Sequence, residues 1–413
     1  MGYKMQPITS LNKIISYKTQ GLMIIDQSAM NDIEIYWEKL LKCNLRFLQF
    51  KSFDDNLTLY PVDYQSVLFK ENKFEIDYKF YQNKTILVTG AGGSIGSEIT
   101  KELIKTPNIK LILIDNNELN LFNIQKEIKE SNNLNIIFYL ISVLDTKKIT
   151  NLFKDNNIDI VIHAAAYKHV RLLEDQPYVA IENNYLSTKK LYDLAKNHDV
   201  KNFLLISSDK AVRPTSLMGV SKRLAELYCL LEKNEMTNLS IVRFGNVINS
   251  SGSVFTIFID QIKKNIPITV THREVKRYFM SIQQASKLVL EANTFLKNSI
   301  YHLDMNEPQN IYLMAKNLIK LHGYQPVTSS KDINDYSRLI TITGLKTGEK
   351  LYEELLVDKK SQPTRNMDIF ASIENIDLED TRMLIKEVDL YLNNSNKESL
   401  QNILLNKLIN YKK

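Results

Sequence analysis

The stretch Thr85-Ile-Leu-Val-Thr-Gly90-Ala-Gly-Gly-Ser-Ile-Gly96 decides the fold of this 413-residue chain. Its first five residues are apolar or β-branched, which predicts a buried strand, and the glycines that follow predict a tight turn. A helical pattern then covers residues 97–105. Such a turn lets the backbone approach an anion closely, and the helix N-terminus adds unpaired N–H groups and a positive dipole end. The stretch therefore predicts a site for the pyrophosphate of a dinucleotide.

The same pattern continues along the chain on the C-terminal side of this stretch. Short β-branched runs alternate with helical patterns, of which 180–196 is the longest. This alternation predicts βαβ units and a Rossmann-type doubly wound parallel sheet in the α/β class. The runs that we expect to be strands are 85–89, 111–115, 136–140, 158–163, 203–207 and 239–244.

The chain divides into three predicted regions. Residues 1–80 indicate a small N-terminal α/β cap and linker, and residues 81–300 form the Rossmann domain with the catalytic residues. Residues 301–413 indicate a smaller, helix-rich C-terminal substrate lobe, which also draws on 245–280. Runs that resemble strands or helices outside the Rossmann domain are 21–26, 32–42, 45–50, 339–343, 379–392 and 399–410.

The composition argues against several classes of protein. The 53 Lys+Arg and 47 Asp+Glu residues give a formal net charge of +6, but they are interspersed, so we expect no nucleic-acid partner. Cys43 and Cys229 lack the neighbours of a disulfide framework or a metal site, so no metal is expected. Because the sequence has no signal-peptide pattern and no run of about 18 apolar residues, we expect a cytoplasmic protein without a membrane span.

Two groups of small or acidic residues refine the cofactor prediction. Asp115 ends the second predicted strand, about 20 residues after the glycine turn. A carboxylate there accepts hydrogen bonds from the adenosine ribose and repels a 2′-phosphate, so NAD is predicted rather than NADP. A role for Asp115 as a helix N-cap stays open as the alternative. Ala164, Ala165 and Ala166 follow the fourth strand and leave room for the nicotinamide ribose, and Asn184 lies in a helix behind it.

Polar residues also follow the fifth predicted strand. Ser208, Asp209 and Lys210 come directly after the run 203–207. Functional residues of open α/β sheets gather at the C-terminal ends of strands, which makes these three residues candidates for catalysis. Lys222 lies on the next predicted helix, where its charge could reach the nicotinamide ribose and lower the pKa of nearby hydroxyls.

Taken together, these motifs resemble the extended short-chain dehydrogenase/reductase superfamily. Within it, the chain is similar to the bacterial polysaccharide-biosynthesis dehydratases that act on UDP-N-acetylglucosamine. The resemblance spans roughly residues 84–356, and its most specific segments are Ala-Ala-Tyr-Lys-His-Val, Ser-Asp-Lys-Ala-Val-x-Pro-Thr, Arg-Phe-Gly-Asn-Val, Lys-Arg-Tyr-Phe-Met and Gly-Glu-Lys-Leu-Tyr-Glu-Glu-Leu. It implies an NAD-dependent enzyme for a UDP-sugar, acting in surface polysaccharide biosynthesis as a homo-oligomer.

The resemblance also implies a mechanism. Oxidation at the sugar C4 would make the C5 proton acidic, water would leave across C5 and C6, and the hydride would return to C6. Asp209 would be the acid and Lys210 the C5 base, with the pKa of Asp209 raised by burial and that of Lys210 lowered by its neighbours. Ser208 and Lys222 would assist the oxidation. Met218 stands where most members carry the Tyr of Tyr-x-x-x-Lys, as in the larger dehydratases that retain configuration at C5.

Two sets of binding residues are carried over from the family. The cofactor set is Gly90, Gly92, Gly93, Ser94, Ile95, Gly96, Asp115, Ser142, Val143, Ala164, Ala165, Ala166, Asn184 and Lys222. The substrate set is Lys168, His169, Asn246, Ser253, Val254, Thr271, Arg277 and Glu349. The pair Ser142-Val143 departs from the usual Asp-Val beside adenine. Two alternatives stay open: a nucleotide-sugar 4-epimerase, against which Met218 argues because epimerases keep the Tyr, and an inactive NAD-binding scaffold protein.

Overall fold

The computed structural model describes residues 21–26, 33, 36–53, 56–64, 67, 76–128, 135–295, 298–356, 360–393 and 404. The chain forms two compact units. The Rossmann unit comprises Asn72–Ser253, Lys276–Pro308 and Leu345–Lys413. The second unit comprises Met1–Glu71, Val254–Val275 and Gln309–Gly344.

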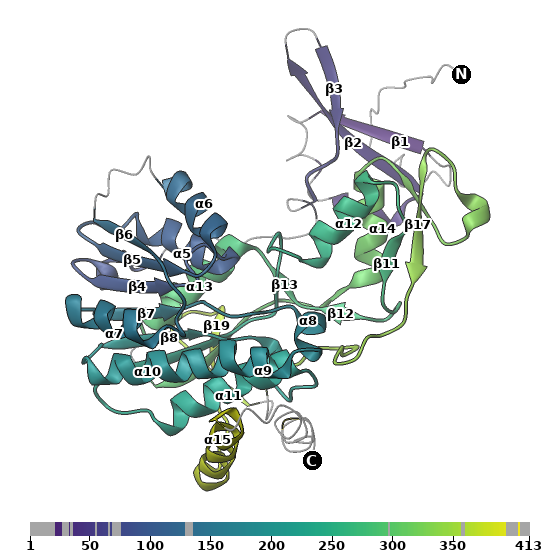
Figure 1. Cartoon of the computed structure of the whole chain (residues 1–413). Coiled ribbons are helices and arrows are strands. Elements are labelled where there is room, and N and C mark those ends of the chain that lie inside the picture. Colours follow the sequence, from purple (N-terminus) through teal and green to yellow (C-terminus); the bar gives the residue numbers. More distant parts are fainter. Residues whose placement is uncertain are drawn as a thin grey trace. The chain divides into compact units, whose positions relative to one another are not determined.

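A sheet of nine described strands forms the centre of the Rossmann unit (Figure 1). Its spatial order is β18-β19-β14-β9-β8-β7-β4-β5-β6, and all strands from β14 to β6 run parallel. The chain runs outward from β4 to one edge and from β7 to the other, so the order reverses between these two strands, where open α/β sheets bind ligands. The strands are β4 (Thr85–Thr89), β5 (Lys110–Asp115), β6 (Ile136–Leu140), β7 (Ile160–His163), β8 (Asn202–Ile206), β9 (Asn238–Arg243), β14 (Ser299–Leu303), β18 (Ser361–Pro363) and β19 (Ile369–Ser372).

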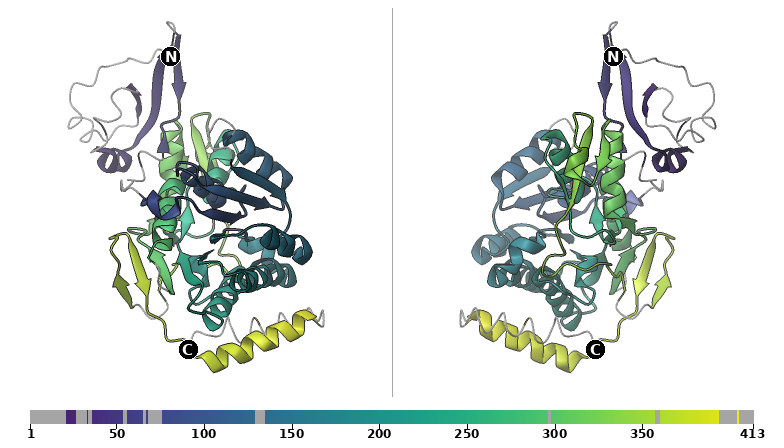
Figure 2. Two further views of the ribbon diagram at one scale, coloured as in Figure 1. Left: turned by 90° about the vertical axis from the view of Figure 1, so that its left-hand side faces the viewer. Right: turned by 90° about the vertical axis from the view of Figure 1, so that its right-hand side faces the viewer.

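Helices cover both faces of this sheet, because its strands are apolar on both sides. One face packs against α5 (Ser94–Leu103), α6 (Glu118–Ile128) and α13 (Ile282–Asn293). The other packs against α7 (Thr146–Asp155), α10 (Ser187–Asn197), α11 (Leu217–Leu231) and α15 (Leu378–Asn393). Figure 1 shows α15 next to α11, and Figure 2 shows it as the yellow helix on the outside of that layer. The predicted α/β doubly wound fold is confirmed.

Shorter elements complete the Rossmann unit. The predicted helix 180–196 is divided into α9 (Pro177–Ala180), a π-helical turn (Ile181–Leu186) and α10. The Thr188 hydroxyl at the start of α10 donates to the carbonyl of Asn184 in this turn at 2.7 Å. Such π-turns are frequent at functional sites. The remaining elements are η3 (Tyr78–Tyr81), α8 (Val170–Glu174), η5 (Asp209–Ala211), β10 (Asn246–Val247), β12 (Lys276–Arg277) and β13 (Phe279–Met280).

The second unit contains two small sheets, ordered β1-β2-β3 and β11-β17-β16. Lys320 on α14 donates hydrogen bonds to the carbonyls of Leu41 at 2.8 Å and Cys43 at 2.7 Å, and so ties the N-terminal segment to this unit. The elements are β1 (Gly21–Asp26), α3 (Trp37–Lys42), β2 (Leu45–Phe53), β3 (Asn56–Tyr60), α12 (Val254–Lys263), β11 (Ile268–Val270), β15 (Gln309–Asn310), α14 (Ile311–Leu321), β16 (Gln325–Val327), η6 (Ser330–Asp332) and β17 (Ser337–Ile342).

The two units differ from the predicted domain boundaries. The N-terminal segment is no separate cap, because it packs with residues 254–275 and 309–344 in one unit. Residues 301–413 are no single helix-rich lobe, since they contribute β16 and β17 to the second unit and return β18, β19 and α15 to the Rossmann unit. Contacts between distant segments decide these boundaries, and local periodicity does not show them. The predicted helix 399–410 lies outside the described residues apart from Leu404.

Within the described ranges, no helix is both long and apolar enough to cross a membrane. The same residues contain no group of three or more His, Cys, Asp or Glu side chains that could hold a metal ion.

Candidate active site

The glycine turn between β4 and α5 is shaped by close backbone contacts. Gly90 has a positive φ of 64°, and a Cβ on it would lie 2.7 Å from the Cα of Ala165. A Cβ on Gly96 would lie 2.1 Å from the Gly90 carbonyl oxygen, so the first turn of α5 packs directly against the end of β4. Gly93 is the N-cap of α5. The first N–H groups of the helix, which include those of Ser94 and Ile95, therefore face the end of the sheet without intrahelical partners.

Asp115 at the end of β5 holds this turn in place. Its carboxylate accepts hydrogen bonds from the backbone N–H groups of Gly92 and Asn117, both at 2.9 Å. Each carboxylate oxygen can accept a second hydrogen bond, so the side chain keeps capacity for hydroxyl donors of a ligand. Asp115 is not the cap of α6, because the Oδ1 of Asn117 accepts the hydrogen bond from the Asn120 N–H at the start of this helix, at 2.9 Å.

A groove of about 220 Å³ opens beside these residues, at the sheet's reversal of strand order. It unites eight of the predicted cofactor residues: Gly90, Gly93, Asp115, Ser142, Val143, Ala164, Ala165 and Ala166. The prediction did not include nine further lining residues: Ile114, Asn116, Asn117, Asn120, Ile141, Leu144, Tyr167, Asn183 and Ser187.

Two buried side chains brace the wall of the groove from behind. His163 lies between the hydroxyls of Thr89 at 2.7 Å and Thr188 at 3.0 Å, and burial together with Lys222 lowers its pKa to about 3, so the ring is neutral. Asn184 was predicted to contact the cofactor, but its amide bonds both the N–H and the carbonyl of Tyr167, at 2.8 and 2.9 Å. Asn184 therefore holds the segment at Tyr167, and its contact with the cofactor stays a prediction.

The catalytic candidates meet at the C-terminal end of β8. Asp209 is fully buried, and its Oδ1 accepts hydrogen bonds from the Ser208 hydroxyl and the Lys210 ammonium, both at 2.9 Å. Its Oδ2 is buried and has no hydrogen-bond partner among the described residues. A Cβ on Gly245 would lie only 3.1 Å from this oxygen. A buried carboxylate oxygen without a hydrogen-bond partner destabilises the folded protein. We therefore expect this atom to form a hydrogen bond with a bound ligand.

Lys210 lies among several polar groups. Besides Asp209, its ammonium donates to Asn246 Oδ1 at 3.1 Å and lies 3.9 Å from Glu353 Oε1. Burial disfavours the charged amine, but the carboxylates of Asp209 and Glu353 outweigh burial, so the pKa of Lys210 is raised. The predicted lowering of this pKa is therefore wrong for the ligand-free protein.

Lys222 and Met218 lie on the same helix in different surroundings. The Lys222 ammonium is buried and donates to the Ile206 carbonyl at 2.5 Å, and burial lowers its pKa to about 8 against the opposing charge of Glu226. Met218 packs in a small apolar cluster with Leu173 and Ala180. Its thioether therefore supplies no group for proton transfer, as the sequence indicated.

Part of the predicted substrate set gathers at a glycine loop. The N–H of Ser251 donates to the Ser94 hydroxyl at 3.1 Å, which joins this loop to the start of α5. Gly252 has a φ of 67°, and a Cβ there would lie 2.4 Å from the ring of His169. Ser253 lies in this loop, and Lys168 is exposed beside His169. Val254 and Thr271 lie in the second unit.

Arg277 and Glu349 were both predicted to bind substrate, and in the ligand-free protein they pair with each other. The buried guanidinium of Arg277 donates to Glu349 Oε1 at 3.3 Å and to the carbonyls of Lys350 at 2.8 Å and Leu351 at 3.3 Å. The guanidinium N–H groups that were predicted to bind a diphosphate thus form hydrogen bonds with the segment that carries Glu349.

Sequence reasoning missed several buried charges of the site. Glu353 belongs to the segment Gly-Glu-Lys-Leu-Tyr-Glu-Glu-Leu, yet only its Glu349 was singled out. Next to the candidate catalytic residues, the Ser207 hydroxyl donates to Glu226 at 2.6 Å, and Glu226 pairs with Arg243. A signal was present, because charged residues inside otherwise apolar strand and helix runs are buried only with partners.

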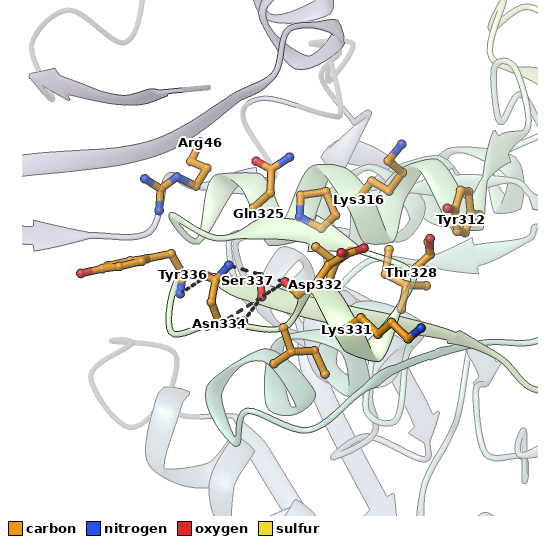
Figure 3. Close-up of a pocket in the computed structure, with 14 residues that line it drawn as sticks. Arg46, Tyr312, Lys316, Gln325, Thr328, Lys331, Asp332, Asn334, Tyr336 and Ser337 are labelled. Carbon is orange, nitrogen blue, oxygen red and sulfur yellow. Dashed lines mark hydrogen bonds between the residues drawn. The ribbon is translucent and has the colours of Figure 1, made fainter. Parts of the chain in front are cut away.

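A larger hollow of about 880 Å³ lies in the second unit (Figure 3). Its lining includes Arg46, Lys316, Lys331 and Asp332, none of which is buried, and Arg46 lies over the ring of Tyr336 at 5.5 Å. None of the predicted site residues lines it. The smaller groove of the Rossmann unit is therefore the better candidate, because it unites the predicted cofactor residues.

Comparison with known proteins agrees with the family resemblance that the sequence motifs indicated. The family model described as polysaccharide biosynthesis protein matches residues 86–375. The capsular polysaccharide biosynthesis protein CapD of Staphylococcus aureus is 40% identical over 330 residues, which are 78% of this chain and 53% of that protein. The chain thus spans about half the length of this curated relative.

Solved structures share the fold. Pen from Bacillus thuringiensis is 28% identical with a TM-score of 0.63, over 75% of this chain and 98% of that one. The UDP-glucose 4-epimerase of Thermus thermophilus, in complex with NAD, is 18% identical with a TM-score of 0.56, over 67% of this chain and 91% of that one. At that identity, the second likeness concerns the fold alone.

Proposed function

The chain belongs to the polysaccharide biosynthesis protein family, and from this premise we propose that it is an NAD-dependent 4,6-dehydratase of a nucleotide sugar. The substrate would be UDP-N-acetylglucosamine, and the product a UDP-4-keto-6-deoxy-N-acetylhexosamine. The observation that carries the proposal is the buried pair Asp209 and Lys210 at the C-terminal end of β8, in which one carboxylate oxygen has no partner among the described residues.

The shape of the glycine turn and the residues at the groove support a nicotinamide dinucleotide as the cofactor. Gly90 and Gly96 leave no room for a Cβ, so the turn can approach a pyrophosphate closely. Asp115 would hold the adenosine ribose and Lys222 the nicotinamide ribose. NAD, when bound, would supply the hydride acceptor and donor for the sugar. The same fold binds NAD in the Thermus thermophilus epimerase.

The Asp209 and Lys210 pair can carry the protons of a dehydration. Lys210 takes the C5 proton as the bond between C6 and its oxygen breaks, and Asp209 gives a proton to the departing hydroxyl, which leaves as water. This step ends with an ammonium beside a carboxylate, which is the ion pair that the ligand-free protein contains. A proton shift along the 2.9 Å hydrogen bond from Lys210 to Asp209 would restore the neutral pair for the next turnover.

Product analysis tests the proposal against the two alternatives. The purified protein would be incubated with UDP-N-acetylglucosamine and NAD in deuterated water, and the sugar followed by NMR. We expect a 4-keto-6-deoxy product with solvent deuterium at C5, whose configuration also reports retention or inversion. An intact C6 alcohol with inverted C4 would indicate a 4-epimerase, and bound NAD without any turnover would indicate a scaffold protein. Either result would overturn the dehydratase.

Asp115→Asn is expected to weaken NAD binding about 10- to 100-fold, since hydrogen bonds to a charged group contribute about 1.5–3 kcal/mol. The amide also removes the charge that repels a 2′-phosphate, so the preference for NAD over NADP should shrink. Titration calorimetry with both cofactors measures these changes. Asp145→Asn is the matched control, because Asp145 caps α7 through Lys148 and Asn is an equally good cap. Unchanged NAD affinity in Asp115→Asn, or tighter NADP binding by the wild type, would contradict the assignment.

A further inference from the structure

Glu353 is a buried carboxylate that links two cations of the site. Its side chain is 4% exposed. Its Oε1 lies 3.9 Å from the Lys210 ammonium and 3.8 Å from Nε of Arg277. Its Oε2 is buried and has no hydrogen-bond partner among the residues that the structure describes. Glu353 is therefore held by charge at a distance rather than by hydrogen bonds, unlike Asp209, which bonds Lys210 directly.

The charges around Glu353 form an alternating row. Arg277, Glu353, Lys210 and Asp209 follow one another at 3.8, 3.9 and 2.9 Å. The row begins beside Glu349, which pairs with Arg277, and ends at the unpartnered Oδ2 of Asp209. Lys350 adds a weaker positive field on Glu353, and it pairs with Glu354 at 3.4 Å. Asn246 is the neutral partner of Lys210.

We propose that Glu353 is a positioning residue for Lys210, whose carboxylate keeps the lysine protonated and beside Asp209 until substrate enters. The inference rests on the proposed function, because a dehydratase needs Lys210 as a neutral amine at the moment of C5 deprotonation. Arg277 shares the carboxylate with Lys210, so a ligand that draws Arg277 away changes the field on Lys210. Glu353 thus couples the predicted diphosphate site to the catalytic amine.

The direction of the effect follows from the charges. A carboxylate near an amine favours the ammonium and raises its pKa, and opposite charges within about 4–6 Å shift a pKa by about 1–3 units. In this protein the pKa of Lys210 is raised although burial opposes it, with Asp209 and Glu353 as the causes. Burial in turn raises the pKa of Glu353 itself, while Lys210 and Arg277 favour its charged form. Removal of the Glu353 charge must therefore make Lys210 neutral at a lower pH.

Competitive acetylation of the ligand-free protein tests this without any reaction. Acetic anhydride labels only neutral amines, and peptide mass spectrometry follows Lys210 as pH rises. In Glu353→Gln we expect the half-point of labelling at Lys210 to fall by about one pH unit or more. Glu354→Gln is the matched control, because the neighbouring carboxylate pairs with Arg213 at 3.0 Å rather than with Lys210. An unchanged half-point in Glu353→Gln, or an equal shift in Glu354→Gln, overturns the proposal.

The dependence of kcat on pH supplies the second measurement. The proposed cycle needs one proton shared by Asp209 and Lys210, so activity should fall at the pH where Lys210 loses this proton to solvent. This limb should move to lower pH in Glu353→Gln, and Glu353→Asp, which keeps the charge, should restore much of the wild-type profile. A purely structural role would lower activity at every pH without moving this limb, and that result would also overturn the proposal. If the wild type makes no 4-keto-6-deoxy sugar while the labelling shift occurs, the dehydratase fails and the positioning role stands.

Discussion

Asp209→Asn and Lys210→Ala are each expected to reduce the turnover of UDP-N-acetylglucosamine by about 100- to 10,000-fold, the usual contribution of a general acid or base. The Asn amide keeps the size of Asp209 but has no acidic proton to give to the departing hydroxyl. The Ala side chain leaves no amine to take the C5 proton. Neither residue lines the cofactor groove, so NAD affinity should change little.

This result is checked by single-turnover kinetics together with NAD titration of each variant. Lys201→Ala is the matched control, because this exposed lysine precedes β8 whereas Lys210 follows it. Lys210→Arg adds a sharper comparison, since arginine keeps the ion pair with Asp209 but cannot be deprotonated. We expect it to be as inactive as Lys210→Ala. Near-normal turnover in any of these three catalytic variants would show that another group moves the protons.

The candidate cofactor site could be located from sequence because the residues that shape it are local. The glycine turn, the strand before it and the helix after it are contiguous in the chain, and Asp115 ends the neighbouring strand. Each of these residues acts mainly through its own backbone geometry or its place at a strand end. The predicted Rossmann-type sheet and eight of the residues that line the groove follow from such local rules.

The ionisation of the candidate catalytic residue Lys210 could not be predicted in the same way. The raised pKa of Lys210 depends on Glu353, which comes from a segment far along the chain and reaches the site only in the folded structure. The partners of Asn184 could not be predicted either, because its amide bonds Tyr167 and Ser221 on another helix. Sequence shows which polar residues are near a site, but it does not show which group pairs with each hydrogen-bond donor and acceptor.

The domain boundaries were mistaken for the same physical reason. The hydrogen bond from Lys320 to Leu41 spans 279 positions in the chain. It gives the N-terminal segment a partner that no periodic pattern reveals. Likewise β19 adds antiparallel to β14 at the edge of the Rossmann sheet, so a segment assigned to a separate lobe completes the sheet instead.

A buried ion network beneath the site should be the part of the fold most sensitive to mutation. Arg243 is fully buried, and it donates to Glu226 from Nε at 2.7 Å and from a terminal nitrogen at 2.5 Å, and also to Glu374. Arg223 bridges the same two carboxylates at 2.9 and 2.8 Å. Burial alone would raise the pKa of Glu226, but Arg243 and Arg223 hold it at about 2. Glu226 is therefore charged at neutral pH because the arginines are present.

Arg243→Met is expected to lower the free energy of unfolding by about 3–5 kcal/mol, the usual cost of removing one partner from a buried pair. That is a large share of the roughly 5–15 kcal/mol that stabilises a folded protein. The loss should be greatest at neutral pH, where Glu226 stays charged with Arg223 as its remaining arginine partner. It should shrink as pH falls toward 4, because without Arg243 the pKa of Glu226 rises and protonation removes its charge. Urea unfolding at several pH values measures both effects.

Lys264→Met, which breaks an exposed pair with Asp260, should change stability little. An Arg243→Met protein that unfolds at the wild-type urea concentration would mean that the two glutamates find other partners.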